Sequence, residues 1–98
     1  MGYTSEVIVG FKHRGLKRFF EAGDARGLKT SHVPKIRRIL ARLNAATTVR
    51  ELDAPGLRLH PLKGGRKGRW AVDVDRTWRI TFRFDGRDCD EIDYEDYH

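Results

Sequence analysis

The amino-acid sequence predicts an α+β fold in which two N-terminal helices pack on an antiparallel sheet. Hydrophobic residues repeat at about 3.6 residues in the first half of the chain and at about 2 residues in the second half. The strand candidates of the second half follow one another through short turns, which is typical of antiparallel sheets. The chain has 98 residues, of which 39% are hydrophobic, and it lacks an internal repeat. We therefore expect a single domain over residues 1–98.

The first half contains one strand candidate and two helix candidates. Residues 6–11, EVIVGF, are β-branched and indicate a short strand, and residues 16–24 indicate a helix that ends near Gly23. The clearest helix covers residues 31–46, with Ser31 as N-cap and a proline in the first turn. Residues 47–52 add a helical turn. The apolar stripe of the long helix consists of Val33, Ile36, Ile39, Leu40 and Leu43.

The second half predicts four strands, at residues 57–60, 69–75, 78–84 and 88–96. Residues 75–77 are a short connection, so the two central strands should form a hairpin, and Asp85-Gly86 should form a second tight turn. Alternation places Trp78, Ile80, Phe82 and Phe84 on the core face, and Ile92 and Tyr94 should anchor the last strand there. The opposite face should display Arg58, His60, Arg79 and Arg83.

The net charge of +6 is unevenly distributed along the chain. Residues 1–70 have a balance of +11 and residues 71–98 a balance of −5. Clustered Lys and Arg are typical of a nucleic-acid binder, although a solvated basic surface is the alternative, and charge does not separate an enzyme from a binding module. The acidic patch near residues 85–96 has no predicted role.

Several classes of protein are not expected. The sequence has no apolar run near the ~20 residues of a membrane span and no pattern of a secretory leader. Cys89 is the single cysteine, so we expect neither a disulfide nor a zinc site, and a reducing cytoplasm is the simplest setting. The four histidines are scattered and the GGRKG loop at 64–68 lacks phosphate-loop spacing, so we expect no metal and no cofactor.

The last residues carry groups suited to acid–base chemistry. Asp96, Tyr97 and His98 would be a polar tail on composition alone, but the core anchors of the last strand should hold them against the sheet. RNA can be cut by its own 2′-hydroxyl if a base, an acid and stabilising cations are supplied, which histidine and arginine do without metal. A lone His60 is more often a surface residue, yet it should share a face with Arg79.

A resemblance to a known family covers nearly the whole chain, from about Ile8 to His98. The segments FKHRGLKRFFEAG, RLHPLKGGRKGRWAVDVDRTWRITFRF and YEDYH resemble the HigB-like toxins of the RelE/ParE superfamily. The resemblance implies a bacterial, cytoplasmic toxin with a microbial-ribonuclease-like fold that cuts mRNA in the ribosomal A site. It also implies a HigA-like helix-turn-helix antitoxin as partner, with operon DNA bound only through the toxin–antitoxin complex.

The resemblance also implies the site residues. The family's functional positions match His60, Lys63, Arg79, Asp96, Tyr97 and His98. The two histidines and Asp96 are the proton-transfer candidates, without a division of roles. Phosphate contacts are expected from Lys63, Arg66, Lys67 and Arg83, although the glycine-rich loop could be only a flexible basic turn. Two alternatives remain, a ParE-like gyrase inhibitor, against which His60 and His98 argue, and a non-catalytic nucleic-acid-binding module.

Overall fold

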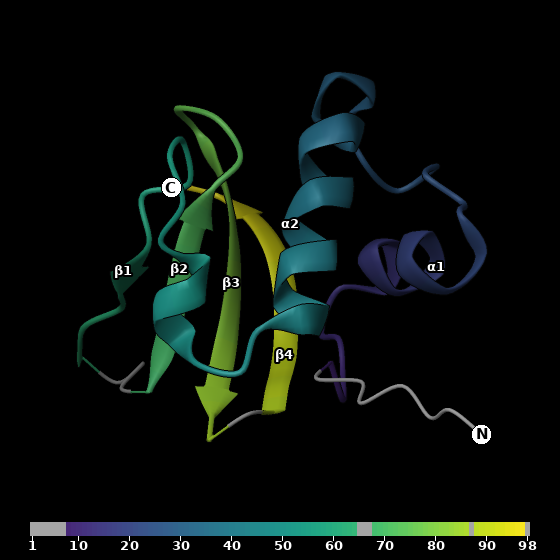
Figure 1. The fold of residues 1–98 in the computed structure, drawn as a ribbon. Helices are drawn as coiled ribbons and strands as arrows, with labels where there is room; N and C mark the ends of the chain where they lie inside the picture. The colour runs from purple at the N-terminus through teal and green to yellow at the C-terminus, as the bar shows by residue number, and fades with distance from the viewer. Residues whose placement is uncertain (1–7, 65–67, 87, 98) are drawn as a thin grey trace, which may run out of the picture.

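A four-stranded antiparallel sheet lies against two helices in the computed structural model, which describes residues 8–64, 68–86 and 88–97 (Figure 1). The helices are α1 (Arg14–Ala22) and α2 (Val33–Ala45), with short 3-10 turns η1 (Thr30–His32) and η2 (Val49–Leu52). The strands β1 (His60–Pro61), β2 (Arg69–Asp73), β3 (Trp78–Asp85) and β4 (Asp88–Asp96) are neighbours in chain order. The predicted α+β class is confirmed. No helix in these residues has the length and hydropathy needed to span a membrane.

The two helices begin differently from the prediction. The imidazole of His13 accepts the backbone N–H of Leu16 and caps α1, so this helix starts at Arg14 instead of residue 16. The helix ends at Gly23, as predicted, and this glycine adopts the left-handed conformation. The prediction of Ser31 as N-cap of α2 is wrong. Ser31 lies inside η1, whose turn leads directly into α2, and the N-cap position belongs to His32 without a side-chain cap.

The strand predicted at 69–75 ends at Asp73, and the strand predictions at residues 6–11 and 57–60 fail over most of their described length. Within residues 8–11, only two isolated parallel bridges form, Ile8 with Cys89 and Phe11 with Ile92. Residues 6 and 7 of this predicted strand lie outside the described residues. The predicted strand 57–60 pairs only from His60 onward, because Arg58 has a φ of 50°, which is incompatible with an extended strand.

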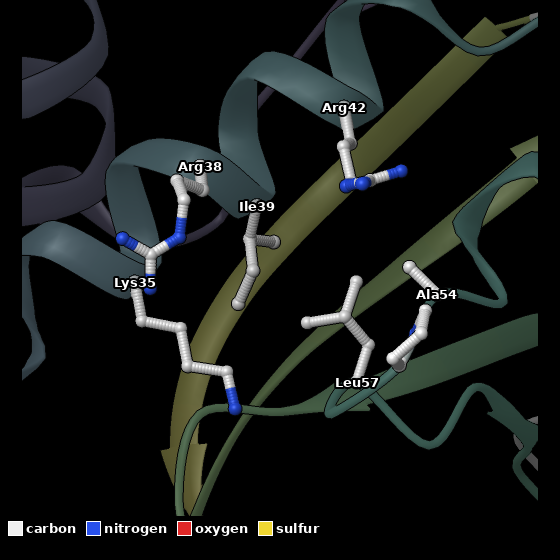
Figure 2. A pocket seen from close by; sticks show the side chains of 7 residues that line it. Lys35, Arg38, Ile39, Arg42, Ala54 and Leu57 are labelled. Carbon is white, nitrogen blue, oxygen red and sulfur yellow. The ribbon is translucent and has the colours of Figure 1, made fainter.

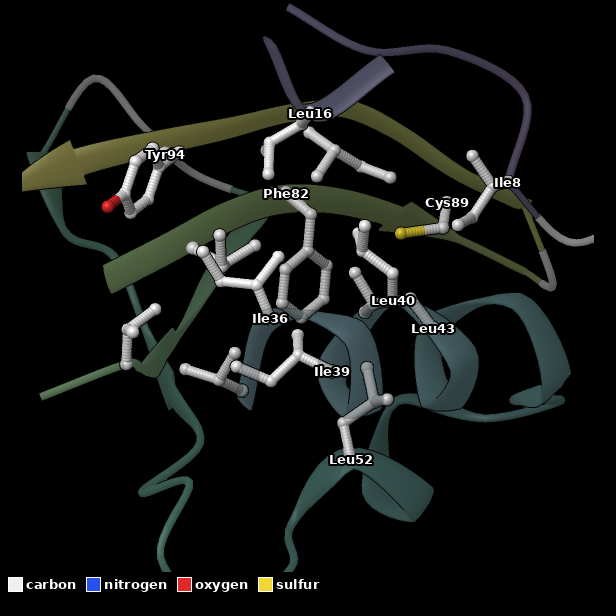
Figure 3. Packing of buried hydrophobic residues seen from close by; sticks show 14 of the residues in the cluster. Ile8, Leu16, Ile36, Ile39, Leu40, Leu43, Leu52, Phe82, Cys89 and Tyr94 are labelled. Atoms are coloured by element: carbon white, nitrogen blue, oxygen red, sulfur yellow. The ribbon is translucent and has the colours of Figure 1, made fainter. Parts of the chain in front are cut away.

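The core lies between α2 and the sheet, as the two periodicities predict. Phe82 points from β3 towards Ile36 and Ile39 of α2 (Figure 3). A bulge in β4 adds one residue, because Thr81 pairs with Asp93 while Arg83 pairs with Asp90. The buried residues that β2, β3 and β4 contribute to this face are Val72, Ile80, Phe82, Cys89, Ile92 and Tyr94.

The burial of Cys89 predicts an inert thiol. Its side chain is fully buried, and burial raises the pKa of the thiol to about 12. At pH 8 we expect no reaction of the native protein with a thiol-specific reagent over the time in which the denatured protein reacts completely. Stoichiometric labelling of the native protein at the rate of a free thiol would contradict this packing, and a Cys89→Ala variant controls for reaction elsewhere.

Candidate active site

The candidate site lies on the sheet face that points away from α2. Residues directly opposite each other in neighbouring strands share a face. The register therefore groups Asp73 with Arg79 and Glu95, and it groups His60 with Ala71, Thr81 and Asp93. The prediction that His60 and Arg79 share one face of the sheet is confirmed. From ordinary strand spacings, the Cα atoms of these two residues are roughly 12 Å apart, across two strands and one row of residues.

Arg79 is held by two neighbours and is less displayed than the sequence predicts. Its side chain is 16% exposed, and its Nε and Nη2 atoms donate to Glu95 Oε1 at 3.1 and 2.9 Å. Its guanidinium carbon also lies 4.6 Å from the centre of the Tyr97 ring, a cation–π contact. These contacts fix the direction of the guanidinium, and they mean that a bound phosphate would compete with Glu95 for it.

Tyr97 is anchored at both its backbone and its side chain. Its N–H donates to the carbonyl of Thr77 at 2.7 Å, and its hydroxyl donates to Asp73 Oδ1. Burial, and then the hydrogen bond to Asp73, raise the pKa of Tyr97 above its ordinary value. The phenol therefore keeps its proton near neutral pH and can act as a donor. The prediction that this end of the chain is held against the sheet is confirmed as far as Tyr97.

His60 lies on the short strand β1 and is half-buried. Its Nδ1 atom is 2.8 Å from the carbonyl oxygen of Arg58. A carbonyl can only accept, so Nδ1 carries the proton of that hydrogen bond. In the neutral ring Nε2 then has the free lone pair, which is the arrangement that a proton acceptor needs.

The contacts above join Arg79, Glu95, Tyr97 and Asp73 into a cluster around Arg79. Asp96 is not part of this cluster. It is exposed and pairs with Trp78 across β3 and β4, whereas Glu95 is the residue opposite Arg79. Lys63 is exposed and lies in the segment that follows β1. Arg83 is more open, with 56% of its side chain exposed and its Nη1 3.7 Å from Glu91 Oε2. The predicted site residues Arg66, Lys67 and His98 lie outside the described residues.

Two carboxylates of the cluster were missing from the sequence prediction. Asp73 is buried, accepts the Tyr97 hydroxyl and lies 3.4 Å from Arg58 Nη1, and Glu95 pairs with Arg79. Alternation could have found both, because Asp73 follows inward-facing Val72 and Glu95 follows inward-facing Tyr94. The acidic patch thus has a role in part, since β4 supplies counter-charges to the arginines of this face.

A separate basic cavity lies on the helical side of the molecule. It has a volume of about 320 Å³ and is lined by cations of α2 and by the loop before β1 (Figure 2). It shares no lining residue with the cluster around Arg79. Its lining residues are Lys35, Arg38, Ile39, Arg42, Ala54, Pro55 and Leu57.

The described residues contain no group of three His, Cys, Asp or Glu side chains that could hold a metal ion. The functional groups gathered on the open sheet face are an imidazole, a phenol, guanidinium groups and carboxylates. These groups can transfer protons and stabilise negative charge on their own.

An α+β fold with acid–base groups and guanidinium groups on an open sheet face agrees with a RelE-like toxin, and the comparison with family models identifies the chain as one. Residues 9–98 match the family model of the HigB-like toxin, described as the RelE-like toxin of the type II toxin–antitoxin system HigB. Endoribonuclease HigB of Proteus vulgaris is 44% identical over 92 residues, which are 94% of this chain and 100% of that protein. The chain belongs to the HigB-like toxin family, which confirms the resemblance and implies an antitoxin partner.

A solved structure shows the same fold at low sequence identity. The crystal structure of YafQ from E. coli matches with a TM-score of 0.55 and 12% identity, over 91% of this chain and 90% of that one. At this identity the likeness concerns the fold alone.

The pairing of Tyr97 with Asp73 predicts a measurable change in the titration of the phenol. An Asp73→Asn variant keeps an oxygen that can accept the hydrogen bond but removes the negative charge. We expect the pKa of Tyr97 to fall towards its ordinary value, without reaching it because burial remains. NMR titration of labelled tyrosine would measure this, with Tyr94 as internal control. An unchanged Tyr97 titration in the variant would contradict the contact.

Proposed function

We propose that this chain is a ribosome-dependent endoribonuclease toxin that cuts mRNA in the ribosomal A site by metal-independent acid–base chemistry. Membership of the HigB-like family and 44% identity to a protein named Endoribonuclease HigB make endoribonuclease activity the function of this chain. The single structural observation that supports the chemistry is the common sheet face of His60, Arg79 and Tyr97.

The proposed mechanism assigns roles from the geometry of these groups. The lone pair on Nε2 of His60 would accept the proton of the 2′-hydroxyl as it attacks the adjacent phosphorus. Arg79 would stabilise the charge that develops on the phosphorane. Tyr97 keeps its proton, and its hydroxyl would turn from Asp73 to donate a hydrogen bond to the reacting phosphate or its leaving oxygen. His98, the next residue, is the proposed proton donor to the 5′-oxygen, and Asp96 remains a proton-transfer candidate.

The proposed binding surface extends beyond the reacting groups. Lys63, Arg66, Lys67 and Arg83 would contact phosphates of the mRNA or the ribosome. The proposed partner is a HigA-like helix-turn-helix antitoxin, with operon DNA reached only through the complex. We also propose that the protein is cytoplasmic, that residues 1–98 form a single domain, and that the fold is microbial-ribonuclease-like.

Ribosome dependence is tested by comparing naked mRNA with the same mRNA on translating ribosomes. We expect efficient cleavage only on ribosomes. Binding of the protein to the ribosome–mRNA complex should weaken steeply with salt, because phosphate contacts release counterions. Equal cleavage of both substrates at matched RNA concentration would exclude ribosome dependence. A ParE-like protein would instead inhibit gyrase without cutting RNA, and a binding module would do neither.

Arg79→Ala should lower the cleavage rate by on the order of 10²–10³, as removal of one transition-state donor does. Arg79→Lys should recover only part of the rate because it cannot make the paired guanidinium contacts. The alanine variant leaves half-buried Glu95 without this partner, so we expect a loss of about 1 kcal/mol in the free energy of unfolding. Arg83→Ala is the control on the same strand and should have a smaller effect. A folded Arg79→Ala protein with full activity would contradict the assignment.

His98→Ala should abolish most activity while leaving the fold intact. Loss of a proton-transfer group lowers rates by about 10²–10⁴-fold, whereas the core anchors Ile92 and Tyr94 are unchanged. The free energy of unfolding should therefore change by roughly ±0.5 kcal/mol, as for a surface substitution. Growth arrest by the variant at wild-type expression would show that His98 has no catalytic role.

A further inference from the structure

A buried histidine on the helical side of the sheet is not used by the proposed chemistry. His32 is 4% exposed, and both of its ring nitrogens are engaged. Nδ1 is 2.6 Å from the Tyr94 hydroxyl and Nε2 is 2.6 Å from Asp75 Oδ2. A carboxylate can only accept, so Nε2 carries a proton in either charge state of the ring. The Tyr94 oxygen also accepts the N–H of Lys29 at 3.4 Å, which completes a polar network around the buried imidazole. The Asp75 side chain at its outer end is 43% exposed.

The second oxygen of Asp75 shapes the turn between β2 and β3. Oδ1 accepts the N–H of Thr77 at 2.9 Å and that of Trp78 at 2.8 Å, as the side chain of an Asx turn does. The backbone N–H of Thr77 and then His32 hold the pKa of Asp75 well below its usual range. Asp75 thus joins the buried histidine to this turn as a carboxylate.

The same turn holds the active-site end of the chain. The carbonyl of Thr77 accepts the N–H of Tyr97 at 2.7 Å, one residue beyond the end of β4 at Asp96. The end of β4 and the β2–β3 turn accordingly lie at the same end of the sheet (Figure 1). Side-chain contacts with Asp73 and Arg79 then orient the Tyr97 ring.

We propose that His32 and Asp75 are positioning residues, which fix the 75–77 turn so that Thr77 holds Tyr97 beside Arg79. This inference rests on the proposed role of Tyr97 in catalysis. Burial of the His32 imidazole costs desolvation, which an apolar residue of similar volume would avoid. An apolar residue at position 75 could not orient the turn, because only a hydrogen-bond acceptor can bind the N–H groups of Thr77 and Trp78.

The first test measures placement without using catalysis. Hydrogen exchange of the Tyr97 amide, followed by NMR, reports its bond to Thr77. In Asp75→Ala we expect this exchange to accelerate by about tenfold, the size of one lost hydrogen bond, while amides within β2 and β3 change less. Asp75→Asn should retain most of the protection, because its Oδ1 can still accept from the turn and its NH2 group can donate to Nε2 of the other neutral His32 tautomer.

A matched control and a second variant sharpen the result. Asp24→Ala removes a similar carboxylate that accepts the N–H of Arg26 in the turn after α1, and it should leave Tyr97 exchange unchanged. His32→Phe keeps an aromatic ring against Trp78 and Tyr94 but removes both hydrogen bonds, and it should accelerate Tyr97 exchange in the same direction. Wild-type exchange of Tyr97 in Asp75→Ala overturns the proposal, and wild-type exchange in His32→Phe overturns it for His32.

The second test measures mRNA cleavage by the same proteins. In Asp75→Ala we expect kcat to fall by about 10–100-fold with KM unchanged, since misplacement of an active-site group by about 1 Å can lower rates 10²-fold. Asp75→Asn should restore most of kcat. Unchanged kcat in Asp75→Ala, with a Tyr97→Phe variant inactive, overturns positioning and leaves the proposed function intact. A wild-type protein that cuts no mRNA on ribosomes overturns the proposed function, while the exchange test still decides the placement of Tyr97.

Discussion

The bulge in β4 is the constraint on which the rest of the sheet depends. Side chains of a strand alternate between its two faces, so a shift of one residue reverses every position beyond it. The extra residue lets Cys89 and Ile92, three positions apart, both face the core. Glu91 accommodates it with a φ of 52°, in the left-handed region that residues with a Cβ rarely adopt. Downstream of the bulge, Tyr94 consequently faces the core and Glu95 faces Arg79.

The bulge also organises charge on the open face. Glu91 accepts from Arg69 and lies near Arg83, while Glu95 engages Arg79. A chain with a net charge of +6 thus neutralises part of its own basic face in the absence of RNA. Arg79 and Glu95 are 16% and 28% exposed, so this pair is screened by water less than a surface pair. A phosphate must therefore offer Arg79 better contacts than the Glu95 carboxylate already does.

The sequence predicted the parts of the fold that a single period controls. The last strand, residues 88–96, and the α2 stripe around Ile36 follow regular alternation or helical spacing. The errors occurred where local geometry overrides the period, as at Arg58 with its positive φ and at Ser31 inside a 3-10 turn. The bulge could not be read from the sequence, because no residue type in residues 88–96 marks an inserted position.

The candidate site was predictable in its cations and less so in its carboxylates. Arg79 stood out because a charged residue lies between Trp78 and Ile80 in a strongly alternating strand. Alternation alone puts Asp73 and Glu95 on the open face, but only the register shows that both lie opposite Arg79, which is tertiary information. The contacts of His32 were even less predictable from the sequence, because its partners Asp75 and Tyr94 are 43 and 62 residues away in the chain.

Two separate sets of contacts determine the position of Tyr97. Core packing of Ile92 and Tyr94 decides which face each residue of β4 takes, whereas Thr77 decides where the backbone of Tyr97 lies beyond the strand. The two controls meet at Tyr94, whose ring fills the core and whose hydroxyl binds His32. Because the first control acts in the core and the second at the β2–β3 turn, the open face needs only to orient its own side chains. That separation would let Arg79 exchange Glu95 for a phosphate without loss of the core contacts that hold the fold.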